Sequence, residues 1–154
     1  MFRALFVAAA VLSDGGAAGA APAHSHVSCK GEPREIAVRV VNVKESVGLM
    51  TVELYRNDPE GFLNKKGREF RVRFAAKAPE TAFCVHAPTA GAWAMAVYHD
   101  ENANQKFDKN GFGLPAEPFG LSQNPKIRLA LPAIEKSLFE VAETGASVEI
   151  RLRD

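Results

Sequence analysis

The sequence has no excess of charge of either sign and no long apolar segment after its first residues. Its 154 residues include 19 lysines and arginines against 18 aspartates and glutamates. This balance gives no electrostatic reason to expect nucleic acid or an anionic membrane as a partner. No later segment approaches the stretch of about 20 apolar residues that a membrane span needs. Helical periodicity is scarce, and there is no internal repeat.

The first 23 residues have the pattern of a secretory signal peptide. Met1–Arg3 form a short positive region, Ala4–Leu12 are apolar, and Ala21–Ala23 give an A-x-A cleavage pattern. The apolar run is too short to cross a bilayer. We therefore expect residues 1–23 to be removed and the mature chain to be periplasmic or extracellular. Cleavage after Ala20 is a second option.

The sequence has only two cysteines, Cys29 and Cys84, and both remain after removal of the signal peptide. In an oxidising compartment an even pair predicts one disulfide. The alternative is a pair of reduced, buried thiols. Neither cysteine has C-x-x-C spacing or follows a predicted helix start, so a catalytic cysteine is not expected.

Apolar residues alternate with polar or small ones in short runs, which is the period of a strand with one buried face. Turn-forming glycine, proline, asparagine and aspartate separate these runs. The strands expected are Ile36–Val40, Met50–Leu54, Phe70–Phe74, Ala82–His86, Trp93–Tyr98, Ser137–Val141 and Val148–Leu152. Ile127–Leu131 is a candidate edge strand, and Pro132–Lys136 a candidate helical turn.

This pattern predicts an all-β fold, an antiparallel β-sandwich of about seven strands with immunoglobulin-like or transthyretin-like strand order. The sandwich domain is expected over residues 35–154, after an N-terminal extension over residues 24–34.

One stretch, from His99 to Pro125, loses the alternation and is rich in asparagine, aspartate, glycine and proline. A connection of about 25 residues is unusual in a compact domain, and such loops tend to be functional or disordered. This one contains large apolar residues that allow it to pack, so an ordered functional loop is expected. They are Phe107, Phe112, Leu114, Phe119 and Leu121.

The start of this loop carries oxygen side chains in a calcium-loop pattern. Asp100, Asn102, Asn104 and Asp108 match positions 1, 3, 5 and 9 of D-x-[DN]-x-[DN]-G, and Lys106 would offer its backbone carbonyl at position 7. Calcium takes six to eight oxygen ligands. Two other residues are candidates for a further carboxylate, Glu117 by folding back and, less favourably, Glu101.

Two positions depart from the calcium-loop pattern. Gln105 stands where glycine allows a sharp turn, and Gly111 stands where a bidentate glutamate is usual. We therefore expect calcium, if bound, to be held with a modest dissociation constant of about 10⁻⁴–10⁻³ M. The alternative is a turn rich in Asn and Asp that caps itself with side-chain hydrogen bonds.

The same residues resemble a family signature. The segments Tyr98–Asp108 and Gly113–Ser122 are similar to the HDEN-x-NGK-x-D and G-x-P-x-E-x-[YF]-G-[FL]-S segments of the secreted bacterial family known as domain of unknown function 2141. Pro88–Val97 resembles the strand that precedes them, and a looser similarity covers about residues 35–153. Gln105 is the one notable departure. The resemblance implies a secreted sandwich domain and brings no established activity.

Two other groups of residues are candidate sites. His86 and His99 with Asp100 and Glu117 are candidates for a transition-metal or hydrolytic site, but they lack H-x-x-x-H spacing. Ser122 with His99 and Asp100 lacks a nucleophile elbow. We expect structural histidines instead.

If the signal peptide is cut after Ala23, the chain starts His24-Ser25-His26, which can chelate Cu(II). Lys65–Arg68 with Arg71 and Arg73 form a basic patch, which is expected to be the solvated face of a hairpin.

These observations favour a non-enzymatic module of the cell envelope, with one disulfide and a calcium-type loop, that binds a protein or a polysaccharide. The alternatives are a metal-dependent hydrolase and a periplasmic copper-binding protein.

Overall fold

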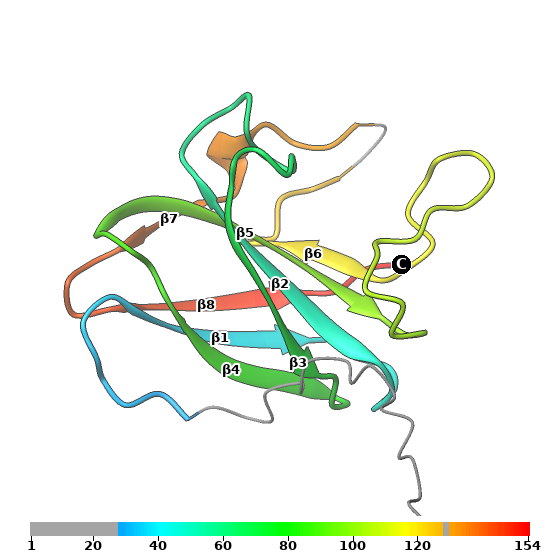
Figure 1. The fold of residues 1–154 in the computed structure, drawn as a ribbon, viewed down its shortest axis with the longest axis horizontal. Coiled ribbons are helices and arrows are strands. Elements are labelled where there is room, and N and C mark those ends of the chain that lie inside the picture. The colour runs from blue at the N-terminus through cyan, green and yellow to red at the C-terminus, as the bar shows by residue number, and fades with distance from the viewer. Residues whose placement is uncertain (1–27, 128–129) are drawn as a thin grey trace, which may run out of the picture.

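A computed structural model describes residues 28–127 and 130–154 of the chain. Strands in two sheets make up this part, together with one short 3-10 turn (Figure 1). The elements are β1 (Glu35–Val41), β2 (Leu49–Arg56), β3 (Arg68–Ala75), β4 (Glu80–His86), β5 (Gly91–Asp100), β6 (Phe119–Leu121), η1 (Ile134–Lys136), β7 (Leu138–Val141) and β8 (Ala146–Arg151).

The two sheets contain three and five strands. The smaller sheet has the order β4-β1-β8, and the larger has β3-β2-β5 with β6 and β7 both pairing with the far edge of β5. The predicted all-β sandwich is confirmed. One pair departs from the antiparallel expectation, because β1 and β8 run parallel. These strands come from opposite ends of the domain, so no short hairpin fixes their relative direction.

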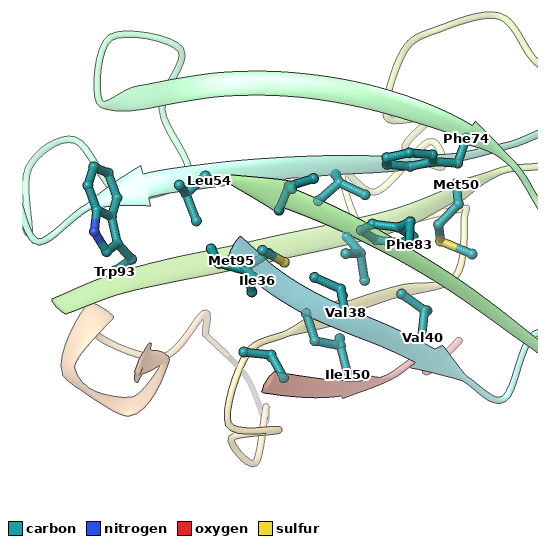
Figure 2. Packing of buried hydrophobic residues seen from close by; sticks show 14 of the residues in the cluster. Ile36, Val38, Val40, Met50, Leu54, Phe74, Phe83, Trp93, Met95 and Ile150 are labelled. Carbon is teal, nitrogen blue, oxygen red and sulfur yellow. The ribbon is translucent and has the colours of Figure 1, made fainter. Parts of the chain in front are cut away.

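The core lies between the sheets and is formed by the alternating apolar positions (Figure 2). Ile36, Val38 and Val40 of β1 are at most 2% exposed, and they face side chains of the larger sheet such as Met50 and Met95. Each side chain of this size contributes about 1.5–3 kcal/mol when it is fully buried. Strand alternation was therefore a sound guide to the inner faces.

The outer face of the larger sheet is covered as well, which the alternation did not predict. In β2 every residue from Met50 to Tyr55 is buried, whichever way its side chain points. The cover consists of residues from the connections 57–67 and 122–137, packed on Tyr55, Ala94 and Ala96. The covering residues are Phe62, Leu63, Ile127 and Ile134. Strands with both faces buried lose the polar side that period-two patterning assumes.

The disulfide between Cys29 and Cys84 is confirmed, and it ties the segment before β1 to β4. The two Cα atoms are 5.4 Å apart, and the bridge spans 55 positions in sequence. Closing a chain loop of this length stabilises the fold mainly by restricting the unfolded chain. Within the described residues, no helix is long and apolar enough to cross a membrane.

Strand β6 lies where the sequence predicted only loop. Its register places Phe119 opposite Tyr98 and Gly120 opposite Val97. The candidate helical turn in Pro132–Lys136 is present as η1. The candidate edge strand Ile127–Leu131 contains residues 128–129, which lie outside the described residues, and its other residues belong to no strand.

Gly120 of β6, in the larger sheet, lies in close contact with β8 of the smaller sheet. A Cβ atom there would lie 2.6 Å from Cγ2 of Ile150 and 2.7 Å from the carbonyl oxygen of Arg151, both in β8. A bridge between Phe119 and Arg153 continues the contact. Only a residue without a side chain fits between β5 and β8 at this position.

We predict that Gly120→Ala lowers the free energy of unfolding by about 1–3 kcal/mol, because the methyl group would push β6 away from β8. Gly111→Ala is the matched control, since a Cβ at Gly111 meets nothing within 4 Å. Urea unfolding of both variants checks the expectation. Equal stability of the two variants would show that the close contact at β6 is unimportant.

Candidate functional site

The long loop starts and ends on neighbouring strands. The Asx-rich loop (residues 100–108) leaves the end of β5, and the chain returns through Glu117 and Pro118 into β6. The amide of His99 donates to the carbonyl of Pro118 at 2.8 Å, which joins the two ends. Between them the chain extends beyond the strands (Figure 1). The β5–β6 pairing thus fixes where the loop's first and last acidic residues lie.

His99 anchors the start of the loop from inside the protein. It is fully buried, and its Nε2 lies 2.7 Å from the carbonyl oxygen of Val47. A carbonyl only accepts hydrogen bonds, so Nε2 carries the hydrogen. Its Nδ1 has no hydrogen-bond partner among the described residues, and the nearest carboxylate, that of Glu101, is 3.7 Å away. This supports the expected structural role of His99.

Asp100 closes the turn that follows β5. Its two carboxylate oxygens accept hydrogen bonds from the amides of Asn104 at 3.0 Å and Gln105 at 2.7 Å. Ala103 and Gln105 adopt the left-handed backbone conformation, with φ of 55° and 65°. The sequence indicated this for Gln105, because glycine is usual there. Left-handed backbone costs a residue with a side chain about 1–2 kcal/mol.

The remaining oxygen ligands of the predicted calcium pattern bond to the loop itself. Oδ1 of Asn102 accepts from the amide of Asn104, and Oδ1 of Asn104 accepts from the amide of Lys106. Both asparagines donate their side-chain amides to Oδ2 of Asp108, at 2.8 and 2.7 Å. The geometry is that of the self-capped turn, with side chains satisfying the backbone. These bonds satisfy loop amides from within the chain itself.

Glu117 folds back onto the Asx-rich loop, as a ligand from outside the calcium pattern would have to do. It is 6% exposed, and its Oε2 accepts from the amide of Asp108 at 3.0 Å. Its Oε1 is buried and has no hydrogen-bond partner among the described residues. Burial raises the pKa of Glu117, and the hydrogen bond from the Asp108 amide lowers it only in part. The neighbouring carboxylates raise the pKa further; they belong to Asp100, Asp108 and Glu101. A cation at Oε1 would relieve both effects.

The acidic residues of the loop are not gathered around one point. In the described chain, the one set of three potential ligand atoms mutually within 4.8 Å belongs to Cys29, Glu35 and Cys84, whose sulfurs form the disulfide. A cation that used Asp100, Asp108 and Glu117 together would have to draw their carboxylates closer. Whether these residues bind an ion stays a prediction.

The middle of the loop forms a separate hairpin, the tip (residues 109–115), closed by a bridge between Lys109 and Pro115. Phe112 and Leu114 were expected to pack, but they are 92% and 61% exposed. Phe107 does pack, with its ring centroid 5.1 Å from that of Tyr98. The apolar residues near the sheet are covered, whereas those on the tip have no surface to pack against.

The residues of the hydrolytic alternatives lie apart or are bonded elsewhere. His86 is on β4 in the smaller sheet, with its Nε2 3.0 Å from Glu32, while His99 is on β5 in the larger sheet. The hydroxyl of Ser122 donates to the backbone carbonyl of Ser137, not to His99. The candidate copper ligands His24–His26 lie outside the described residues.

A buried ionic cluster lies on the outer face of the larger sheet, where the sequence predicted a solvated basic patch. Arg68 and Arg71 donate to Oε1 of Glu53 at 2.7 and 2.6 Å, and the Tyr55 hydroxyl donates to Oε2. Burial by itself would raise the pKa of Glu53, but these donors outweigh it and hold the pKa below the ordinary value. The sequence alternation gave no signal that a buried carboxylate lies here.

These features define an all-β sandwich domain with one long, hydrogen-bonded loop between neighbouring strands. The chain belongs to the family described as uncharacterized protein conserved in bacteria, domain of unknown function 2141, whose model matches residues 38–149. Searches of curated proteins and of solved structures give no match. The match confirms the resemblance drawn from the sequence, and it spans the strands β2–β7 and the whole long loop.

We predict that Glu53→Gln lowers the free energy of unfolding by about 2 kcal/mol at neutral pH, because two half-buried arginines lose their counter-charge. The pKa of Glu53 is lower in the folded than in the unfolded chain. Its stabilisation is therefore complete above its ordinary pKa of 4.5 and is lost as pH falls through the folded value. The difference between variant and wild type should shrink over that acidic range.

Urea unfolding from neutral to acidic pH measures this difference. Glu149→Gln is the control, since Glu149 pairs with Arg39 at the surface and both side chains are over 40% exposed. An exposed pair contributes about 0–1 kcal/mol. The interpretation fails if the two variants lose the same stability, or if the loss from Glu53→Gln does not depend on pH.

Proposed function

We propose that this protein is an exported, non-enzymatic module of the bacterial cell envelope whose long loop binds calcium weakly and presents a surface to an envelope protein or polysaccharide. The proposal of calcium binding rests on one observation: the buried Oε1 of Glu117 has no hydrogen-bond partner among the described residues. Asp100 and Asp108 lie close enough for their charges to raise the pKa of Glu117. A buried carboxylate with an unmet acceptor is costly, and a bound cation would offset that cost.

Calcium suits this position better than a transition metal. The available donors are oxygens, from the carboxylates of Asp100, Asp108 and Glu117, the side-chain amides of Asn102 and Asn104, and the Lys106 carbonyl. Hard cations prefer such ligands, and calcium tolerates irregular geometry. Four of these side chains already accept from loop amides, so the ion has to compete with existing hydrogen bonds; they are Asp100, Asn102, Asn104 and Glu117. That competition supports a modest affinity.

Export is supported by two independent features. The first 23 residues have the pattern of a secretory signal peptide. The chain also contains a disulfide, Cys29–Cys84, which persists in oxidising compartments such as the periplasm. The proposal assigns no reaction, because Ser122 and His99 are both buried and bonded to backbone carbonyls.

We predict that calcium raises the melting temperature. With a dissociation constant of about 10⁻⁴–10⁻³ M, about 10 mM calcium should stabilise the fold by roughly 1.4–2.7 kcal/mol. For a domain of this size the shift is a few degrees. EDTA should reverse the shift, as measured by differential scanning fluorimetry of the secreted protein.

Glu117→Gln should abolish this shift, because it keeps the shape of the side chain and removes its charge. Glu101→Gln is the matched control and should keep the shift, since the Glu101 side chain is 46% exposed. The calcium proposal is excluded if the wild type shows no shift at millimolar calcium, or if Glu117→Gln retains the full shift.

A further inference from the structure

The tip (residues 109–115) exposes more apolar surface than its position in a folded domain explains. Phe112 is 92% exposed and Leu114 is 61% exposed. The other exposed large apolar side chains of the described residues are Val47 and Leu131, at 45% and 56%. Single exposed apolar residues are common, but two on one protruding hairpin form a surface that an interaction can use.

Hydrogen bonds hold this surface in place. Asn110 is the centre of the hairpin: its amide donates to the Leu114 carbonyl at 2.8 Å, and its carbonyl accepts from Gly113 at 2.9 Å. Its side-chain oxygen accepts from the amides of Phe112 and Leu114, at 2.9 and 3.1 Å. The exposure of both apolar side chains therefore belongs to an ordered turn. An ordered apolar tip loses little entropy on binding.

Polarity changes in layers along the protrusion. Phe112 and Leu114 lie near the turn, and Lys109, at its base, is the only charged residue of the tip. Behind it lie the exposed Lys106 and Glu101 and the half-buried Asp108, while Asp100 and Glu117 are buried. The charge nearest the apolar end is therefore positive, and an apolar end followed by a cation matches the order of a bilayer, where hydrocarbon lies beneath anionic phosphate.

We propose that the tip is a membrane-docking element, in which Phe112 and Leu114 insert at the headgroup level of a bilayer and Lys109 contacts anionic lipid phosphates. The whole chain is close to neutral, so the attraction is local to the tip. Two apolar side chains and one or two lysines give weak, reversible association. This inference goes beyond the proposed function and needs no ion in the Asx-rich loop.

The surface proposed for an envelope protein or polysaccharide belongs to the rest of the long loop, because such partners fit the tip itself less well. A sugar-binding surface combines an aromatic ring with hydrogen-bonding side chains around it, whereas the neighbours of Phe112 are Gly111 and Gly113. A protein pocket could take Phe112, but it gives no reason for the lysine at the base of the tip. A second copy of the chain is a further possible occupant. The experiment separates these cases from a lipid surface.

The test is co-sedimentation of the secreted protein with vesicles in EDTA, with phosphatidylglycerol and phosphatidylcholine in equal parts or phosphatidylcholine alone. Wild type should bind the anionic vesicles more strongly than the neutral ones. Phe112→Ser with Leu114→Ser should lower the partition coefficient at least about tenfold, as expected when an apolar side chain of this size is lost. Leu131→Ser is the matched control and should bind as wild type.

A second measurement places the tip in the lipid. In Phe112→Trp, brominated lipids should quench the new tryptophan, whereas wild-type Trp93, which is 5% exposed, should stay unquenched. The proposal is overturned if wild type does not bind anionic vesicles, or if the serine variant binds equally well. Self-association that depends on Phe112 without vesicle binding would also overturn it and assign the tip to a second copy.

Discussion

The pairing of β6 with β5 is the constraint on which the rest of the loop depends. It places Phe119 opposite Tyr98 and Gly120 opposite Val97, and so brings the segment before β6 beside the end of β5. This pairing is possible because Gly120 leaves room for β8. Three residues of strand therefore determine how the intervening segment is presented. The disulfide and the sandwich core stabilise the domain, but they do not set this geometry.

The loop combines strong internal bonding with local costs. Asp100 and the two asparagines satisfy backbone amides, which favours order without a ligand. Against this, Ala103 and Gln105 have left-handed backbone, and Glu117 is a buried carboxylate with an unpaired oxygen near other acidic groups. Costs of this kind are typical of functional segments, where a ligand later compensates them. They are the physical basis for assigning the protein's role to the loop.

Sequence alternation predicted seven strands well because their inner faces all meet one core. It could not predict β6, since Phe119–Leu121 is too short to show a period. It gave no signal of the covered outer face of the larger sheet, because a period of two marks the inner face but not what covers the outer one. It also expected Phe112 to pack, because hydrophobicity does not reveal whether a partner surface exists. In the loop, the spacing of acidic and amide residues identified the hydrogen-bonding groups, but not which of them bond to each other.

The loop is preformed by its own side chains, at the cost of burying the carboxyl group of Glu117. Amide hydrogen exchange in calcium-free protein tests this preformation directly, at the amides of Asn104, Gln105 and Asp108, which donate to Asp100 and Glu117. Slow exchange at all three, well below the rate of an unstructured chain, is the predicted result. Exchange at the unstructured rate would contradict the account.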